Sequence, residues 1–249
     1  MHAELAALAA ELRARAELLD DRDWSALTLP SPASGRGDEP SSSPPLPPAG
    51  EGGVRVPEEL ARLAAEVEAC RKCPLGATRL KPAFGVGSPT AQVMFVGEGP
   101  GYEEDRQGEP FVGKAGQLLD KILASVGLSR QAVYIANVVK CHPMVDASQP
   151  DKRGNDRPPT PDEMAACRGY LEAQIRLIRP KVLVALGSTA AKCLLATEDG
   201  VGRLRGRWHD FAGTPLLVTY HPAALLRDET YKRPVWEDMK TLMRTLEAG

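Results

Sequence analysis

The chain has 249 residues and 43% hydrophobic content, which is ordinary for a globular protein, and its formal net charge of −2 gives no overall electrostatic signal for nucleic acid, although a local patch can still bind phosphate. No apolar run approaches the roughly 20 residues that span a bilayer, and the N-terminus lacks an export signal, so we expect a cytoplasmic protein with no membrane partner. In that reducing compartment the five cysteines favour metal binding over a disulfide framework.

The N-terminal part divides into a helix and a linker. Residues 1–27 place several leucines on one helical face, namely Leu5, Leu8, Leu12 and Leu19. This spacing predicts an amphipathic helix that docks on the main domain or on a partner protein. Residues 28–57 are dominated by Pro, Gly and Ser, so they cannot bury enough apolar surface to offset the entropy of ordering. We interpret 28–57 as a disordered linker and 58–249 as the globular domain.

Apolar strands alternate with helices after the linker. A helix is expected over residues 57–68. Continuously apolar segments predict strands at 92–97, 133–139, 181–187 and 215–220. Helices are expected after the first three strands, near 116–126, 161–178 and 188–196. Apolar strands separated by helices are typical of a parallel sheet covered on both faces, so we predict an α/β domain.

The segment 97–113 follows the first predicted strand and is rich in glycine and acidic residues. The carboxyl ends of strands in an open α/β sheet are where ligands bind, which makes this loop a candidate site. A phosphate-binding loop pairs its glycines with lysine, whereas Glu98, Glu103, Glu104 and Asp105 would repel a phosphate. Binding of a nucleoside triphosphate is therefore disfavoured.

Other polar side chains follow the later strands. Asn137 ends the second strand and His221 follows the fourth. Asparagine offers a donor and an acceptor side by side, a neutral histidine donates, and the carboxylate of Glu98 can position or activate water. Phe111 lies in a loop, where an aromatic face can stack on a planar ligand. Taken singly, Asn137 can also be a turn cap, His221 a loop histidine and Phe111 a core anchor.

The cysteines suggest a metal site. Cys70 and Cys73 form a Cys-x-x-Cys turn, and Cys141 and Cys167 supply two more thiols from later in the chain. By spacing alone, structural zinc, an iron–sulfur cluster and unrelated thiols are all compatible with this set. Cys193 lies in an apolar helix, where a free cysteine usually serves as a small core residue, so we leave it out.

These residues fall within ordered motifs that resemble the family 4 uracil-DNA glycosylases, the iron–sulfur branch of their superfamily. The motifs are Gly-Glu-Gly-Pro-Gly at 97–101 with Glu104-Asp105, Pro-Phe-Val-Gly at 110–113, Asn137 before Cys141, and His-Pro-Ala-Ala-Leu-Leu-Arg at 221–227. The resemblance covers roughly residues 58–247 and excludes the N-terminal helix and linker.

The resemblance implies a three-layer α/β/α sandwich with a central four-stranded parallel sheet. It also implies a structural [4Fe–4S] cluster held by Cys70, Cys73, Cys141 and Cys167. The expected activity is hydrolysis of the N-glycosidic bond of uracil in single- or double-stranded DNA, by a monomer in the cytoplasm at the nucleoid. Its N-terminal helix would bind a repair or replication partner.

The resemblance assigns roles residue by residue. Phe111 would stack on uracil, Asn137 would bind its N3 and O4 edge, and Glu104 would exclude the methyl group of thymine. His221 and the backbone near Gly99 and Gly101 would stabilise the departing uracil anion, and Glu98 would activate water. The DNA-binding residues would be Leu225, Leu226 and Arg227, which would enter the minor groove.

The inserted segment, the alternative functions and a group of basic residues are open at this point. Residues 144–156 look like an insertion relative to the family, and the segment 143–166 contains no histidine, which disfavours the covalent trapping found in a related branch. A uracil-DNA binding protein that releases product slowly or not at all is the alternative function, and a metal-stabilised structural partner is a weaker one. Arg203, Arg205 and Arg207 with Lys140 form either a second basic patch or a solvated loop.

Overall fold

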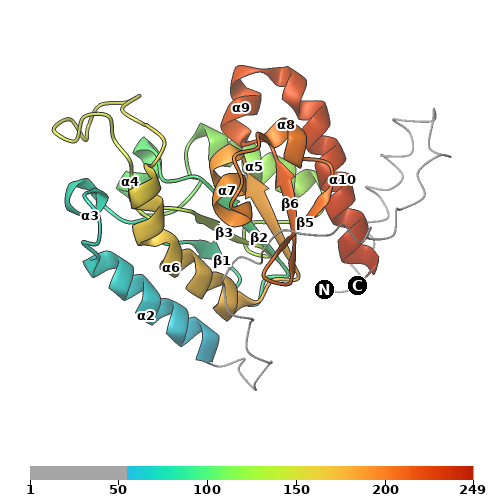
Figure 1. Cartoon of the computed structure of the whole chain (residues 1–249), viewed down its shortest axis with the longest axis horizontal. Coiled ribbons are helices and arrows are strands. Elements are labelled where there is room, and N and C mark those ends of the chain that lie inside the picture. Colours follow the sequence, from blue (N-terminus) through green and yellow to red (C-terminus); the bar gives the residue numbers. More distant parts are fainter. Residues whose placement is uncertain (1–54, 249) are drawn as a thin grey trace.

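The computed structural model describes residues 55–248 (Figure 1). The predicted helix in 1–27 and nearly all of the predicted linker lie outside the described residues. The linker was predicted to end at 57, but α2 (Arg55–Ala69) already begins at residue 55. Within the described part of the chain, no helix is both long and apolar enough to cross a membrane.

The predicted parallel sheet is confirmed and extended by two edge strands. Its strand order is β1-β3-β2-β4-β6-β5. The four inner strands are parallel, namely β3 (Tyr134–Asn137), β2 (Val93–Gly97), β4 (Val182–Leu186) and β6 (Thr214–Thr219). The antiparallel edges are β1 (Val86–Gly87) and β5 (Trp208–Phe211). Neither edge strand was predicted, because β1 is very short and β5 is polar and only partly buried.

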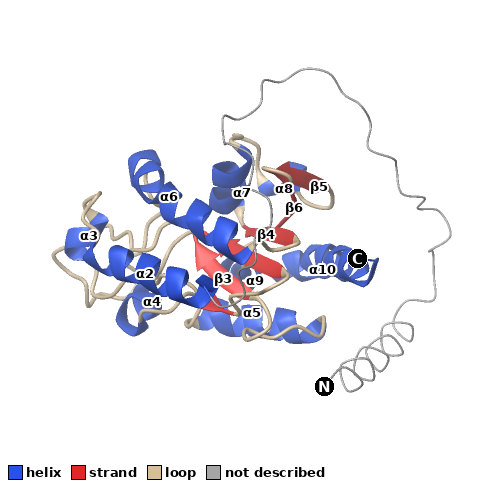
Figure 2. Ribbon diagram, turned by 90° about the horizontal axis from the view of Figure 1, so that it is seen from below, coloured by secondary structure: helices blue, strands red, loops and turns tan. Residues whose placement is uncertain are grey.

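Helices cover both faces of this sheet (Figure 2). One face carries α2, α6 (Pro161–Ile178) and α7 (Ser188–Leu195), with α8 (Val201–Leu204) beside them. The other carries α5 (Lys114–Ser125), α9 (Pro222–Arg227) and α10 (Lys232–Ala248). Shorter helices occupy connecting segments, namely α3 (Leu75–Thr78), α4 (Tyr102–Gln107) and the 3-10 turn η1 (Glu229–Tyr231).

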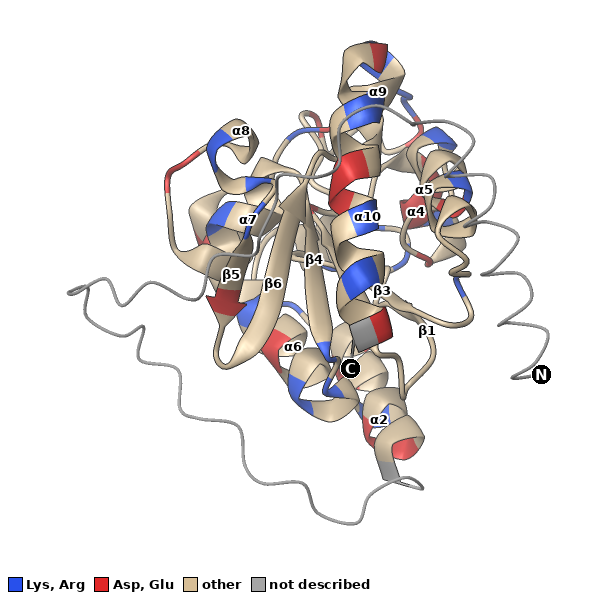
Figure 3. Ribbon diagram, turned by 90° about the vertical axis from the view of Figure 1, so that its right-hand side faces the viewer, with Lys and Arg blue, Asp and Glu red and all other residues tan. Residues whose placement is uncertain are grey.

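Side chains alternate between two cores along each strand. In β2, Met94 and Val96 face the α2/α6 side, while Val93 and Phe95 face the α5/α10 side. All of these side chains are buried, which explains why the strands read as continuous apolar runs and not as alternating ones. Charged side chains lie on the helices and loops, and Asp210 on edge strand β5 is the one charged residue in the described strands (Figure 3).

The helix α10 was not predicted, although Val235, Met239 and Leu242 recur at helical spacing and are buried. It also carries Asp238, whose side chain is fully buried beside β6. Its carboxylate accepts hydrogen bonds from Thr219 Oγ1 at 2.6 Å and from Arg205 Nη2 at 2.8 Å. Burial raises the pKa of Asp238, and these donors oppose that shift. The pairing ties α10 to the sheet and to the segment after α8.

We expect Arg205→Met to lower the free energy of unfolding by about 3 kcal/mol, because it leaves the buried Asp238 carboxylate without its cation. Urea denaturation followed by tryptophan fluorescence measures the change. Arg203→Met is the matched control, since Arg203 pairs with Asp199 on the surface and is 81% exposed. That control should change stability by less than about 0.5 kcal/mol. Equal losses in the two variants would refute a structural role for the buried pair.

Candidate active site

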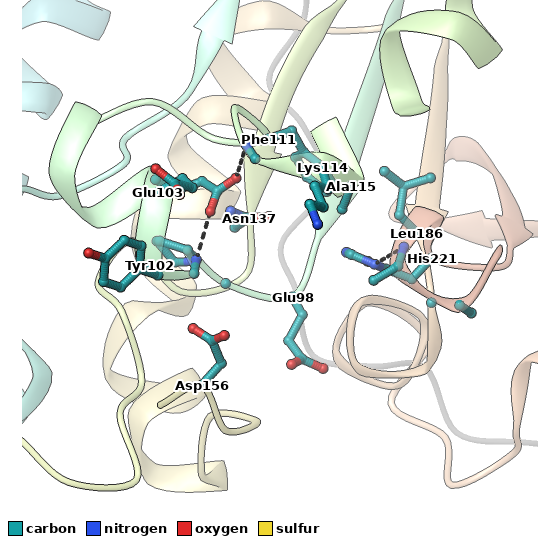
Figure 4. A pocket seen from close by; sticks show the side chains of 18 of the residues that line it. Glu98, Tyr102, Glu103, Phe111, Lys114, Ala115, Asn137, Asp156, Leu186 and His221 are labelled. Carbon is teal, nitrogen blue, oxygen red and sulfur yellow. Dashed lines mark hydrogen bonds between the residues drawn. The ribbon is translucent and has the colours of Figure 1, made fainter. Parts of the chain in front are cut away.

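A cavity of about 610 Å³ opens at the carboxyl ends of the parallel strands. It contains most of the predicted site, namely Glu98, Gly99, Gly101, Glu104, Phe111, Asn137, His221 and Arg227. Figure 4 shows Asn137, Glu98 and His221 arranged around this space. The end of β4 also contributes, through Leu186, Gly187 and Ser188. The parallel sheet therefore brings together residues that are far apart in the sequence.

The floor of the cavity depends on a close approach to Gly97. A β-carbon at this position would lie 2.4 Å from Asn137 Oδ1 and 2.5 Å from the Phe111 ring. Neither contact is sterically allowed, so only glycine lets both side chains meet the end of β2. Asn137 is 1% exposed, and its Oδ1 has no hydrogen-bond partner among the described residues. An unpaired buried carbonyl is costly, so this atom is suited to accept a hydrogen bond from a ligand.

Phe111 adopts a left-handed backbone conformation, with φ of 57°. This conformation is unfavourable for a bulky residue and persists only where surrounding contacts hold it. Arg130 Nη1 donates to the carbonyl of Phe111 at 2.9 Å, and Arg130 Nη2 donates to that of Pro110 at 2.6 Å. The strained loop thereby places the Phe111 ring in the cavity wall, 4% exposed.

Glu104 holds the same loop from the other side. Its Oε1 accepts hydrogen bonds from the backbone N–H groups of Val112 and Gly113, both at 2.9 Å. Its Oε2 accepts one from the backbone N–H of Gly101, the residue before α4, at 3.2 Å. Both carboxylate oxygens are thus used inside the protein, so Glu104 lines the cavity and also positions the segment that carries Phe111.

His221 is held as a neutral hydrogen-bond donor. Its Nδ1 accepts a hydrogen bond from Ala223 N at 3.1 Å, so the proton of the neutral ring is on Nε2. Burial lowers the pKa of His221 to about 4, and the nearby charge of Arg227 adds to this effect. The ring lies 5.4 Å from the Phe111 ring, with a tilt of 31°. A neutral donor and an aromatic surface therefore adjoin in one cavity.

Glu98 is oriented by a residue that the sequence did not single out. Thr189, at the start of α7, donates a hydrogen bond from its hydroxyl to Glu98 Oε2. Thr189 lies far from Glu98 in the chain, and no local pattern connects the two residues. Their contact arises because β2 and β4 are neighbours in the sheet.

A buried histidine holds a further carboxylate, that of Asp156, at the cavity. His142 is fully buried, and its Nε2 lies 2.7 Å from Asp156 Oδ1. The pKa of His142 rises to about 9: burial, the largest single influence, lowers it, but the hydrogen bond with Asp156 and the negative charges of Asp105, 3.8 Å from Nδ1, and Asp156 together outweigh burial. Asp156 lines the cavity, as do Tyr102 and Lys114, none of which was predicted.

The three predicted DNA-binding residues differ in their exposure in the structure. Leu225 is 3% exposed and packs in the core beneath α9, so its predicted insertion into DNA is wrong. Leu226 is 52% exposed, and Arg227 lines the cavity. The alternation follows from helical geometry, which turns one leucine inward and the next outward. The basic-patch alternative also fails in part, since Lys140 is fully buried and Arg205 is bound to Asp238.

Four cysteines line a second, smaller cavity between α2, α6 and the segment after β3, namely Cys70, Cys73, Cys141 and Cys167. Cys193, which the sequence analysis left out of the set, is not among the residues that line this cavity. In the range 55–248, no three His, Cys, Asp or Glu side chains are arranged to hold a metal ion as they stand. The donor set is nevertheless one of four thiols that face a common space.

Cations and amide donors surround these sulfurs. Arg79 Nη1 donates to Cys141 Sγ at 2.8 Å, and the backbone N–H of Lys140 donates to Cys167 Sγ at 3.3 Å. The buried Lys140 ammonium donates to the backbone carbonyl of Asn137 at 2.8 Å. Burial lowers the pKa of Lys140 to about 8, and the neighbouring cysteines oppose that shift. Lys140 therefore connects the cysteine cavity with the residue at the floor of the larger cavity.

Comparison with known proteins identifies relatives. A family model described as the Uracil DNA glycosylase superfamily matches residues 84–240. The chain is 42% identical over 188 residues to a Type-4 uracil-DNA glycosylase of Thermotoga maritima, covering 74% of this chain and 93% of the relative. A Type-4 uracil-DNA glycosylase of Archaeoglobus fulgidus is 39% identical over 193 residues, with coverages of 74% and 92%. A Type-5 uracil-DNA glycosylase of Thermus thermophilus is 32% identical over 165 residues, with coverages of 57% and 68%.

We expect His221 to remain neutral, with its proton on Nε2, from pH 8 down to about pH 5, because burial lowers its pKa to about 4. Nitrogen-15 NMR of the imidazole measures both the tautomer and the titration, and His221→Gln assigns the signal by its loss. Between pH 6.5 and 4, the folded state binds fewer protons at His221 than the unfolded state does. The contribution of neutral His221 to the free energy of unfolding is therefore complete above pH 6.5 and is lost as the pH falls through 4. Titration near 6.5 would contradict the burial argument.

Proposed function

The chain belongs to the uracil DNA glycosylase superfamily, and we propose that it hydrolyses the N-glycosidic bond of uracil in DNA, releasing free uracil and leaving an abasic site. The observation that carries the proposal is the buried Asn137 Oδ1, which has no partner among the described residues and faces the cavity. The N3–H group of uracil is a donor that satisfies it.

The substrate must leave the double helix before it can react. A base stacked in DNA cannot present its glycosidic bond to a buried cavity, so the nucleotide rotates out into the site. Phe111 offers a surface on which the flipped uracil stacks, and its constrained backbone keeps that surface in place before binding. The aromatic wall is thus preorganised.

Asn137 distinguishes uracil from cytosine. Uracil presents a donor at N3 and an acceptor at O4, which match the carbonyl and amino groups of one asparagine side chain. Cytosine presents an acceptor and a donor at the same positions, so both groups of Asn137 would be left unpaired. Each unpaired buried group costs roughly 1–3 kcal/mol. This mismatch supports rejection of cytosine, the undamaged base.

Glu104 has two roles in this proposal. Its carboxylate crowds the part of the cavity that would receive the C5 methyl group of thymine. Its hydrogen bonds to Val112 and Gly113 also fix the loop that carries Phe111. Because both oxygens are held, the carboxylate cannot swing aside easily to admit the methyl group.

Cleavage creates two charges, and the site has a group for each. Negative charge develops on uracil as it departs, and the Nε2–H of His221 donates to it, together with backbone N–H groups near Gly99 and Gly101. Positive charge develops on the sugar, and Glu98 stabilises it and orients the attacking water. The hydrogen bond from Thr189 holds one oxygen of Glu98 and leaves the other for water.

The helix α9 is the element that contacts DNA on one side of the cavity. Leu226 is exposed and can fill the space that the flipped nucleotide leaves, as apolar wedges do in other DNA-distorting proteins. Arg227 lies at the cavity and binds backbone phosphate. Leu225 supports the helix from the core.

The four cysteines fit an iron–sulfur cluster. Cys70, Cys73, Cys141 and Cys167 face one cavity, and Arg79 and Lys140 place positive charge and N–H donors beside the sulfurs, which favours thiolate ligands. We propose that they hold a [4Fe–4S] cluster. When bound, the cluster cross-links the segment after α2, the segment after β3 and α6, and takes no part in the hydrolysis.

An oligonucleotide with a single uracil tests the function. The wild-type protein should produce a strand break after alkali treatment. Glu98→Gln should lower the single-turnover rate by about 10²- to 10⁴-fold, and Asn137→Ala should lower it strongly and weaken discrimination against cytosine. Glu59→Gln removes a carboxylate from exposed α2 and should retain the wild-type rate. A protein–DNA adduct without alkali-labile product would instead favour the alternative, a protein that binds uracil-DNA without releasing product.

Cys141→Ser should abolish the brown colour of the purified protein and lower its thermal stability, because the cluster loses a ligand. Iron analysis should fall from about four atoms per chain to less than one. Cys193→Ser is the matched control and should retain both colour and iron, since Cys193 does not face the cysteine cavity. A colourless wild-type protein that contains zinc and excises uracil would overturn the cluster assignment.

A further inference from the structure

The segment 144–156, which the sequence marks as an insertion, forms part of the active-site wall. Arg153, Gly154 and Asp156 line the same cavity as Glu98, Asn137 and His221. The ends of the segment meet in an isolated antiparallel bridge between Met144 and Asp156. Figure 4 shows Asp156 across the cavity space from His221, next to Tyr102. The insertion is therefore an element of the site and not a remote appendage.

The segment is fastened to the acidic helix α4. Arg153 Nη1 lies 2.7 Å from Glu103 Oε1, and the Arg153 guanidinium lies over the Tyr102 ring at 4.7 Å. Arg106 lies over the same ring at 3.7 Å and forms an ion pair with Asp151. Two arginines, one from each element, thus stack on one tyrosine, which fixes the segment beside the loop that carries Phe111.

The segment also has its own internal support. Asn155 is 3% exposed, and its side chain donates to the carbonyls of Asp146 and Gln149 and accepts from Asp146 N. Directly after the segment, Arg157 pairs with both carboxylate oxygens of Glu163 in α6, at 2.8 and 2.7 Å. These contacts make the segment a preformed wall, so a ligand that meets it loses little entropy in ordering it.

Arg153 presents unused donors at the rim of the cavity. Its side chain is 75% exposed, and the contact with Glu103 uses one of five guanidinium N–H groups. The adjacent Gly154 has φ of +74°, and apart from Gly154 and its chain neighbours no described residue has an atom within 4 Å of the position of a β-carbon there. The largely exposed cation is therefore accessible to an anion, and the residue next to it is not covered by other parts of the described chain.

We propose that Arg153 binds a backbone phosphate next to the flipped nucleotide, in addition to the phosphate bound by Arg227 of α9. The inference rests on the proposed function, because that function supplies the polyanionic strand. Both arginines line one cavity but come from unrelated elements. A flipped nucleotide has a phosphate on each side, and a guanidinium binds phosphate in a fork geometry that a single amino group cannot reproduce. Together the two arginines would bind the phosphates on both sides of the uracil nucleotide.

Binding measurements test this contact against general electrostatic attraction. The affinity of Arg153→Ala for single-uracil DNA should fall roughly tenfold, as expected for the loss of one charge-assisted hydrogen bond. The slope of log K against log salt should decrease by about one. Lys152→Ala is the matched control, since it removes the same charge from the adjacent residue, which is exposed and is not among the residues that line the cavity. Equal effects in the two variants would overturn the proposal.

Neutral methylphosphonate linkages, placed one at a time around the uracil, locate the contact. In the wild-type protein, neutralising one flanking position should weaken binding. In Arg153→Ala the same substitution should have no further effect, and Arg153→Lys should restore only part of the binding. If each position retains its full effect in Arg153→Ala, the residue does not bind phosphate.

The outcomes separate this inference from the function on which it rests. Arg153→Ala should raise KM while kcat at saturating DNA stays within about twofold, because a contact with phosphate, and not with the glycosidic bond that breaks, contributes mainly to substrate binding. Wild-type protein that excises uracil, together with unchanged KM and salt slope in Arg153→Ala, refutes the inference alone. Wild-type protein that releases no uracil refutes the proposed function, and the methylphosphonate measurement still decides whether Arg153 binds phosphate.

Discussion

The close approach of Asn137 and Phe111 to the bare backbone of Gly97 is the contact on which the site depends. These residues come from the ends of two neighbouring parallel strands and from the loop between them in the chain. Any side chain at residue 97 would occupy the space of both the Asn137 amide and the Phe111 ring. The stacking surface and the base-reading amide can therefore converge only because one strand ends in glycine.

The acidity of the loop that follows Gly97 has a mainly structural explanation. Glu104 accepts three backbone N–H groups, and the fully buried Asp105 accepts the backbone N–H of Leu80. Glu103 pairs with Arg153 of the inserted segment. The three carboxylates of Glu103, Glu104 and Asp105 are thus engaged within the protein, and Glu98 accepts a hydrogen bond from Thr189 through one oxygen. Glu98 keeps an oxygen available in the cavity, where a transient cation is expected.

The end of β3 and the segment that follows it join the two chemical centres. These six residues supply Asn137 to the large cavity, Lys140 and Cys141 to the cysteine cavity, and His142 to the pair with Asp156. The Lys140 ammonium donates to the carbonyl of Asn137 while its own backbone N–H donates to Cys167. Two direct hydrogen bonds of Lys140 therefore connect the thiol region with the backbone of Asn137.

The sequence by itself determined the four parallel strands, the helices between them, the convergence of Glu98, Asn137 and His221, and the cysteine set, because periodicity, strand ends and motif spacing are local properties of the chain. Only the tertiary structure decided which other residues contact and orient these site residues. Thr189 orients Glu98, Arg130 and Glu104 hold Phe111 in its strained conformation, and Leu225 turns into the core while Leu226 remains exposed. It also placed the inserted segment against α4. Such contacts join residues tens of positions apart, and they depend on which strands and helices become neighbours, which no local pattern of residues specifies.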